Sequence, residues 1–360
     1  MIPKFDPKEL NVIFETPPNP FFPVMKIYDY PVTPREAVAG ALQGKAFWQV
    51  LASEWKLFTP RALPDNVARG FVFEAQPFDA LSLAGGKDMF GVDWEFHASI
   101  RGSMVRPGNP ILSDANEWRD KIVWPDIDKW DWEGSAKENN GTYLGADDFN
   151  HTWIMTGWFE RLISFMDFEP AIMALFDEDQ KDAVRELFEK LSDLYIKIFD
   201  KYLEYFPNVS GFCFHDDWGS QKETFFSPAL AEEMIVPSMK RVTSYIHSKG
   251  KFTEFHTCGQ LLKQVPNIIA GGWGAWMPQN MNDTAKIYEL YGDKILLGTY
   301  PEMFDPATAS EEVQRASARA YADKFCSPSK PSYLSVYASA MLTPAFREEL
   351  YVRSRENYSK

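Results

Sequence analysis

The second half of the chain alternates between helical and strand patterns, and this alternation constrains the fold more than any other feature. From Lys181 to Phe206, apolar residues recur at three- and four-residue spacing with charges on the opposite side, which is typical of a long helix lying on a sheet. We expect strands at 209–216, 251–258, 273–279, 294–300 and 333–338, with helices between them, the last starting from a capping box at Thr308 and Glu311. Such alternation indicates a parallel sheet with crossover helices.

The length favours closure of that sheet into an α/β fold of the (β/α)8, or TIM-barrel, type, because 360 residues suit one large barrel with additions. An open doubly wound sheet is the alternative, but no Gly-x-Gly-x-x-Gly follows any strand. Residues 1–32 are rich in proline and predict an irregular arm that wraps the body, and a capping box from Thr33 to Glu36 predicts the first helix. We therefore expect an arm over 1–32 and a single barrel domain over 33–360, with inserted loops between 71 and 148.

Composition excludes several function classes. The formal net charge of −14 argues against a nucleic-acid surface and against an anionic membrane face. No signal-peptide pattern opens the sequence, and no run of ~18 apolar residues occurs, so no membrane span is expected. Three cysteines cannot form a disulfide framework and fit reduced thiols, so the expected location is the cytoplasm.

The strand pattern from Phe252 to Gly259 carries the most reactive side chains. Side chains alternate along a strand, so Glu254, His256 and Cys258 share one face. A carboxylate, an imidazole and a thiol near the carboxyl end of a barrel strand form a plausible part of a zinc site. The alternative is a buried, hydrogen-bonded histidine beside a small apolar cysteine.

Two further polar segments follow expected strands. After the strand at 209–216, only one of Asp216 and Asp217 can face the barrel mouth, where it could ligate a metal, act as an acid or base, or orient His256, while the other caps a turn. In the last expected strand, Tyr337 could donate a hydrogen bond or a proton to a substrate oxygen. The alternative for Tyr337 is a group that satisfies a polar barrel interior.

Four segments together resemble one known family. They are Lys87–Trp94 (KDMFGVDW), Pro125-Asp126, Asp216–Gln221 (DDWGSQ) with Ser227-Pro228, and His256–Gly259 (HTCG). In this order and spacing they resemble the uroporphyrinogen decarboxylase-like superfamily, and more closely its branch of corrinoid-dependent methyltransferases. The resemblance runs from about Thr33 to the C-terminus and implies a (β/α)8 barrel. The segment 21–30 contains no arginine, whereas true decarboxylases of this superfamily carry an arginine-rich segment there, so porphyrinogen decarboxylation is not expected.

The resemblance also implies an activity and a site. It predicts methyl transfer from a small methylated substrate to the cobalt of a corrinoid protein, with Zn²⁺ as a cofactor. The abundant Trp, Tyr and Phe favour an aromatic methyl ether as the substrate (O-demethylation), and a quaternary amine held by cation–π contacts is the alternative. His256 and Cys258 match the first two zinc ligands of the family, while the third falls near Ala338 or Ser339 and is not a cysteine here. Either Glu254, Asp217 or Tyr337 completes the site, or the protein does not bind zinc tightly. The predicted catalytic residues are Asp217, His256, Tyr337 and His215, and the predicted substrate-binding residues are Trp94, Trp218, Gln221, Gln279 and Asp88.

Other functions stay open at this point. The methyl group could move in the reverse direction, from a methylcorrinoid to a thiol or pterin. The barrel could be a metal-free decarboxylase or lyase with Asp88 or Asp217 as the acid, or a non-catalytic binding module. The 12 tryptophans exceed what a core needs, and we expect many of them near the barrel mouth as pocket walls, namely Trp94, Trp124, Trp130, Trp132, Trp153, Trp158 and Trp218. The predicted partners are a corrinoid protein, a small methylated substrate and, for the chain itself, a second copy in a homodimer.

Overall fold

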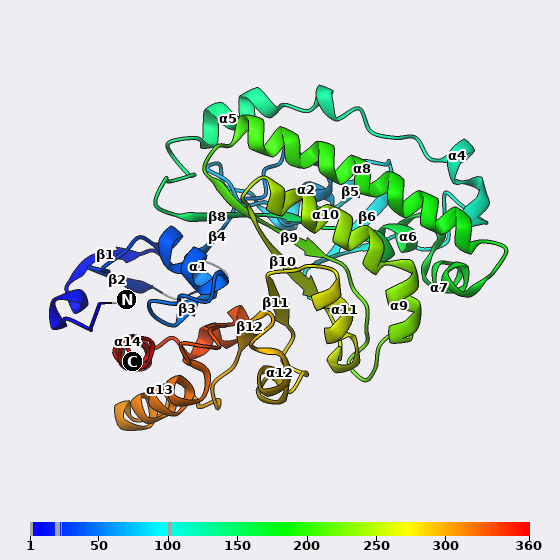
Figure 1. The fold of residues 1–360 in the computed structure, drawn as a ribbon. Coiled ribbons are helices and arrows are strands. Elements are labelled where there is room, and N and C mark those ends of the chain that lie inside the picture. The colour runs from blue at the N-terminus through cyan, green and yellow to red at the C-terminus, as the bar shows by residue number, and fades with distance from the viewer. Residues whose placement is uncertain (1–2, 19–21, 23, 100–101) are drawn as a thin grey trace. The chain divides into compact units, whose positions relative to one another are not determined.

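The structure, a computed structural model, describes residues 3–18, 22, 24–99 and 102–360, so residues 19–21 and 23 of the proline-rich arm lie outside the described part. Eight strands form one sheet in the order β3-β13-β12-β11-β10-β9-β8-β4 (Figure 1). The two ends of this order, β3 (Val50–Leu51) and β4 (Trp55–Leu57), are only three residues apart in the chain, so the sheet is nearly closed. The predicted α/β fold of the (β/α)8 type is confirmed. Among the described residues no helix has the length and apolar character needed to cross a membrane.

The chain divides into two compact units. The first unit comprises Met1–Lys56, Asp147–Phe149 and Gly274–Lys360, and the second comprises Leu57–Ala146 and Asn150–Trp273. In the second unit, β8 (Phe149–Ile154), β9 (Val209–His215) and β10 (Phe252–Thr257) pair in parallel. Every residue of β9 is buried, as expected for a parallel strand covered on both faces. The helices of this unit include α6 (Trp158–Met166), α7 (Phe168–Phe176), α8 (Lys181–Tyr205), α9 (Pro228–Met234), α10 (Val236–Ser248) and α11 (Val265–Ala270).

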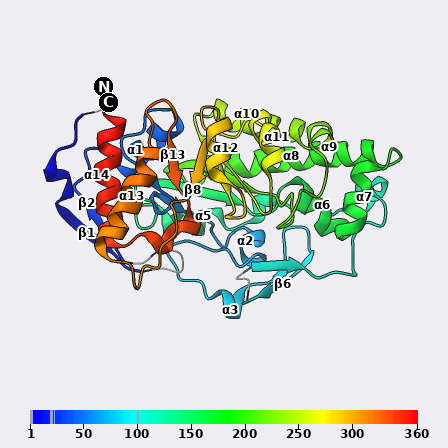
Figure 2. The same cartoon turned by 90° about the horizontal axis from the view of Figure 1, so that it is seen from below.

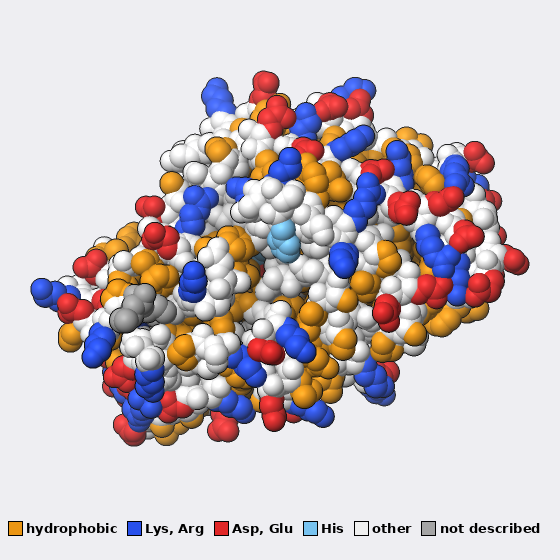
Figure 3. Space-filling model, viewed as in Figure 1, with side chains coloured by type: hydrophobic (Ala, Val, Ile, Leu, Met, Phe, Trp, Pro, Cys, Tyr) orange, Lys and Arg blue, Asp and Glu red, His pale blue; other side chains and the backbone are white. Residues whose placement is uncertain are grey.

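The long helix predicted at 181–206 is α8, and its apolar stripe is buried from Ala183 to Tyr202. Helix α10 runs beside it (Figure 1). The ion pairs Arg185–Glu233 and Arg241–Asp193 link α8 to α9 and α10 on the outer surface. Acidic and basic side chains are interspersed over this surface in the space-filling view (Figure 3). The helix expected between the strands at 209–216 and 251–258 is divided at Ile235, where α9 ends and α10 begins.

An insertion before β8 forms a small antiparallel sheet of β5 (Gly86–Lys87), β6 (Asp93–His97) and β7 (Gly102–Val105). It lies against α2 (Pro64–Ala68) in the second unit (Figure 2). A fully buried arginine, Arg161 of α6, forms ion pairs with both Asp65 and Asp88 and thereby fixes the insertion to α6. The remaining helices of this unit are α3 (Ala80–Leu83), α4 (Trp118–Lys121) and α5 (Trp132–Asn139).

In the first unit, the parallel strands β11 (Ala275–Pro278), β12 (Leu296–Thr299), β13 (Ser332–Leu334) and β3 follow one another. Helices α1 (Pro34–Leu42), α12 (Thr284–Tyr291), α13 (Glu311–Phe325) and α14 (Pro344–Tyr358) accompany them, and α13 and α14 lie side by side (Figures 1 and 2). The capping box predicted at Thr33 and Glu36 is confirmed, because the side chain of each residue accepts the backbone N–H of the other.

Three sequence predictions of local structure in the first unit are wrong. The arm is not irregular throughout, because β1 (Val12–Thr16) and β2 (Met25–Tyr28) form an antiparallel pair. The arm does pack against the body of this unit, since Arg355 of α14 binds both carboxylate oxygens of Glu9 at 2.8 Å. Helix α13 is capped by Ser310, not by Thr308, whose hydroxyl donates to Asp305. The last strand ends at Leu334, and Val336–Met341 forms a 3-10 helix.

Candidate functional site

Two histidines meet at the carboxyl ends of β9 and β10 in the second unit. His215, the last residue of β9, is in register with His256 of β10. Their ring centroids are 5.2 Å apart with an interplanar angle of 30°, and both side chains are buried. Functional side chains of (β/α)8 barrels gather at this end of the strands, so the pair marks the candidate site.

Cys258 supplies a sulfur atom next to both rings. Its Sγ lies 4.0 Å from Nε2 of His215 and 4.0 Å from Nε2 of His256. One ligand atom from each of the three residues lies within 4.8 Å of the others. Tetrahedral zinc, with Zn–S near 2.3 Å and Zn–N near 2.0 Å, holds nitrogen and sulfur about 3.5 Å apart, so the donor types and their spacing fit this ion. The third candidate ligand is therefore His215, which the sequence had indicated as a catalytic residue.

Asp217 borders the same three residues. Its Oδ1 accepts the backbone N–H of Cys258 at 2.7 Å and lies 3.3 Å from Nε2 of His215. Burial opposes the charge, but His215 and the hydrogen bonds from Cys258 outweigh it and lower the pKa of Asp217 below its usual value. Burial, with the charge of Asp217, raises the pKa of the Cys258 thiol. Metal binding through this sulfur would therefore release a proton.

Glu160 and Arg69 contact His215 on the Nδ1 side of its ring, and neither residue was predicted from the sequence. Oε2 of Glu160, near the start of α6, lies 2.6 Å from Nδ1 of His215, and Arg69, directly after α2, contacts Oε1 of Glu160 at 3.2 Å. Burial disfavours the imidazolium, but Glu160 and Asp217 outweigh it and raise the pKa of His215. A carboxylate behind a metal-ligating histidine fixes its ring and tautomer, so Glu160 is placed to hold Nε2 toward Cys258.

The adjacent carboxylates Asp216 and Asp217 have different surroundings. Asp216 is fully buried and accepts the backbone N–H groups of Phe159 and Glu160 at the start of α6, and Nε1 of Trp218 at 3.0 Å. Burial and the nearby Glu160 charge raise the pKa of Asp216 to about 7. One aspartate thus caps a helix and the other faces the histidines, which is the division that the alternation of strand side chains predicts.

Glu254 does not lie with His256 and Cys258. It forms a second group with His151 of β8 and Cys213 of β9, in which a ligand atom of each residue lies within 4.8 Å of the others. Cys213 is in register with Glu254, whereas His215 is in register with His256, so this group lies one layer deeper along the strands. All three side chains are buried, and burial lowers the pKa of His151 to about 3.

Asp88 and Trp94, predicted to bind substrate, belong to the buried ion-pair network of the insertion. Asp88 forms an ion pair with Arg161. Its carboxylate accepts a hydrogen bond from Nε1 of Trp94 at 3.0 Å and hydrogen bonds from the backbone N–H groups of Phe90 and Val92. Only 5% of Asp88 is exposed, so its carboxylate is engaged within the protein. The guanidinium of Arg69 lies 4.6 Å from the ring centroid of Trp94, which connects this network to Glu160.

The other predicted substrate-binding residues are spread over the fold. Trp218 is completely buried between Phe226 and Phe255 and offers no surface to a ligand, whereas Gln221 is exposed on the loop after β9. Gln279 and Tyr337 belong to the first unit, where the Tyr337 ring lies 6.4 Å from that of Tyr300. Because residues 336–341 are helical, Tyr337 does not continue the face of β13, and its role as a proton donor stays a prediction.

Most of the tryptophans expected at the mouth pack elsewhere. Trp132 stacks on Tyr205 of α8, Trp158 stacks on Phe214 in the core, and Trp124 lies against α8. Trp153 is the exception, because its ring lies 5.6 Å from that of His256 and 5.2 Å from that of Phe71.

No protein-family model matches the chain, and no curated protein matches it significantly.

Proposed function

We propose that the chain is a methyltransferase that moves a methyl group from a small methylated substrate to the cobalt of a corrinoid carried by a partner protein. The observation that supports this most is the convergence of His215, His256 and Cys258 at the carboxyl ends of β9 and β10. The motifs that resemble corrinoid-dependent methyltransferases include both His256 and Cys258. The donor set and the resemblance therefore share His256 and Cys258, and the geometry adds His215.

His215, His256 and Cys258 would hold zinc in this proposal. When bound, the ion would supply Lewis-acid stabilisation to the atom that keeps the electron pair of the broken bond to the methyl carbon. Glu160 accepts a hydrogen bond from Nδ1 of His215 and so directs Nε2 into the site. Asp217 accepts the backbone N–H of Cys258 and fixes the position of that residue. These two carboxylates position the ligand side chains and need not contact the substrate.

An aromatic methyl ether is the preferred substrate class. Trp153 adjoins His256, and the half-buried Phe71 and Phe73 extend the apolar surface beside it. In O-demethylation, the methyl carbon leaves oxygen and bonds to cobalt, which supplies the electron pair, and the C–O pair stays on the phenolate, which then takes a proton. Because the ligand set has a single thiolate, it suits stabilisation of a phenolate better than the reverse reaction, which must make an acceptor thiolate more nucleophilic.

A metal-free lyase is a weaker proposal because neither expected acid suits the task. Asp88 is buried in an ion pair with Arg161, and the pKa of Asp217 is lowered, which opposes proton donation near neutral pH.

The proposal is tested with cob(I)alamin in place of the protein-bound corrinoid. Purified, zinc-loaded protein is mixed anaerobically with cob(I)alamin and a panel of methoxyarenes and methylamines, and the conversion of Co(I) to methyl-cobalt is followed by absorbance. We expect methylation with at least one methoxyarene, and loss of more than 90% of the rate in Cys258→Ser. Cys326→Ser is the matched control, since Cys326 is buried in the first unit and donates to Gln49. Absence of methylation with the whole panel, or equal rates in the two variants, would overturn the proposal.

A further inference from the structure

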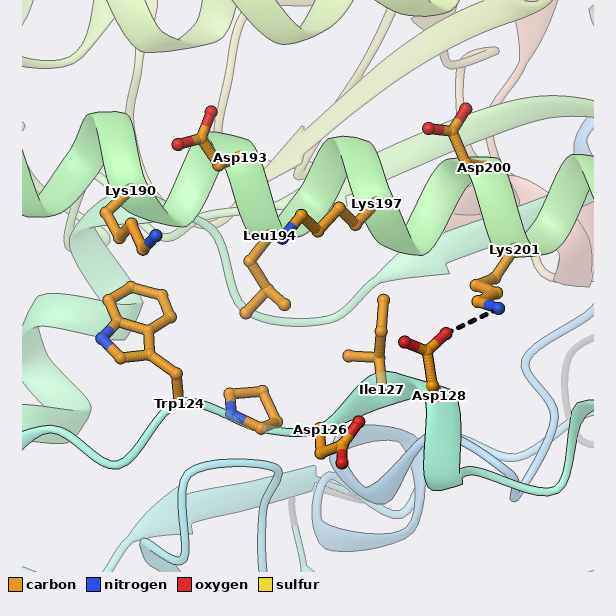
Figure 4. A pocket seen from close by; sticks show the side chains of 11 residues that line it. Trp124, Asp126, Ile127, Asp128, Lys190, Asp193, Leu194, Lys197, Asp200 and Lys201 are labelled. Carbon is orange, nitrogen blue, oxygen red and sulfur yellow. Dashed lines mark ion pairs between the residues drawn. The ribbon is translucent and has the colours of Figure 1, made fainter.

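A groove within the second unit lies between α8 and the segment 124–128. The residues that form it take no part in the proposed site. The groove encloses about 390 Å³ between α8 and the segment 124–128 that precedes α5 (Figure 4). Leu194 and Ile127 are buried and provide an apolar floor, and the half-buried ring of Trp124 forms one wall. This volume lies in the range of small-molecule sites, ~300–1,000 Å³.

Each of the four aspartates that border the groove already binds a lysine, an arginine or a tyrosine hydroxyl of the protein. Asp128 pairs with Lys201 at 2.7 Å, and Asp126 pairs with Lys129 at 3.0 Å. Asp193 and Asp200 point away from the segment 124–128 (Figure 4) and bind Arg241 and the hydroxyl of Tyr245 of α10, respectively. The negative charges around the groove are therefore already compensated or directed outward.

Two lysines of the groove form no close ion pair, although the hydrogen bond and charge of Lys201, and then the charge of Lys197, lower the pKa of Asp128. Among the described residues, no carboxylate lies within 4.0 Å of the ammonium group of Lys190 or of Lys197. Lys190 points toward Trp124, with Nζ 5.7 Å from the ring centroid, and Lys197 lies beside Leu194 (Figure 4). The two lysines are seven positions apart on α8, which corresponds to a rise of about 10 Å. The groove thus combines an aromatic wall and an apolar floor with two positive charges, in a chain whose net charge is −14.

We propose that this groove is a binding site for a small aromatic anion, with its ring against Trp124 and Leu194 and its carboxylate or other acidic group between Lys190 and Lys197. The wall is positioned by the edge-to-face contact of Trp124 with Phe90, at 5.5 Å between ring centroids. Aromatic pairs and charge-assisted hydrogen bonds from ammonium groups are the interactions that recognise such a ligand. The proposal is independent of the methyltransferase activity.

The test compares 1-naphthoate with its neutral counterpart 1-naphthamide by isothermal titration calorimetry on the full chain. We expect one naphthoate per chain and binding of naphthamide at least fivefold weaker, because the lysines recognise only the anion. The double variant Lys190→Gln/Lys197→Gln should weaken naphthoate binding about tenfold, to the level of naphthamide. Raising NaCl from 20 to 500 mM should weaken the binding of naphthoate but not that of naphthamide.

The controls separate this groove from other sites. Lys222→Gln/Lys240→Gln makes the same change in net charge at exposed positions outside the groove and should leave binding unchanged. Trp124→Leu should weaken both ligands, and its circular dichroism spectrum shows whether it folds. Equal binding of the two ligands, no binding of naphthoate at 10 mM, or full affinity in Lys190→Gln/Lys197→Gln would overturn the proposal. Loss of binding in Cys258→Ala but not in the lysine variant would place the ligand elsewhere and overturn it as well.

Discussion

Replacing Glu160 by glutamine isolates the charge behind His215. Glutamine keeps the size of the side chain and a carbonyl that can accept from Nδ1, so the 2.6 Å contact can remain while its charge is lost. A hydrogen bond to a charged group contributes ~1.5–3 kcal/mol and a neutral one ~0.5–1.5 kcal/mol. The difference, about 1–1.5 kcal/mol, predicts a roughly tenfold higher dissociation constant for zinc. Glu160→Ala removes the bond altogether, and we expect it to weaken zinc binding up to about 100-fold.

Zinc affinity is measured by competition with a chromophoric chelator at pH 7.5. The matched control is Glu189→Gln, the same change at an exposed position of α8. As an independent readout, NMR titration of the metal-free protein should show a lower pKa for His215 in Glu160→Gln, because the Glu160 charge raises that pKa. If zinc affinity in both Glu160 variants stays within twofold of that of the unmodified protein, Glu160 does not position His215 as a zinc ligand.

Three further predictions concern stability. Arg161→Met leaves the two buried carboxylates without their partner and should lower the free energy of unfolding by about 3–5 kcal/mol in urea denaturation, and a loss below about 1 kcal/mol would contradict the role given to this network. Gly157→Ala places a Cβ 2.5 Å from Cβ of Asp216 and should cost about 1–3 kcal/mol in the same assay, whereas an unchanged midpoint would show that α6 can move away freely. For Glu54, burial raises the pKa from 4.5 to about 6 in the folded protein, so the folded state binds the proton more tightly and stability falls by up to about 2 kcal/mol as pH rises from 4.5 to 6. Glu54→Gln should lack this part of the pH dependence in chemical denaturation between pH 4.5 and 7.5, and a curve parallel to that of the unmodified protein would exclude it.

The fold was predictable where a periodic pattern reports a buried face. Helix α8 and strands β9 and β10 were located within one or two residues because their apolar residues repeat at the helical spacing or form a continuous buried run. The pattern failed where burial does not decide the structure. Val12–Thr16 is mostly exposed, so its strand leaves no alternation, and after β13 the side chain of Ser335 accepts the N–H of Tyr337 and starts a 3-10 helix that competes with strand extension.

The site was predictable along a strand but not between elements. Alternation placed His256 and Cys258 on one face correctly, but it also grouped Glu254 with them. Glu254 and His256 both lie within β10, where two residues span about 7 Å along the strand, whereas Cys258 follows the last strand residue, Thr257, and its sulfur comes within 4.0 Å of His256. Glu254 therefore falls in the deeper layer with His151 and Cys213. Glu160 and Arg69 reach His215 only through the packing of α6 and α2, and no local pattern in the sequence reports that packing.

We expect His215, His256 and Cys258 to bind one metal ion together, and cobalt(II) substitution shows whether they do. The metal-free protein is titrated with Co²⁺, whose absorption reports both tetrahedral coordination and a thiolate bond. We expect saturation at one ion per chain with a sulfur-to-cobalt charge-transfer band. Cys258→Ser should lose that band and His215→Ala the tetrahedral visible bands, while Glu254→Gln should keep the full spectrum. A spectrum that is unchanged in Cys258→Ser and His215→Ala, or that is abolished only by Glu254→Gln, would contradict it.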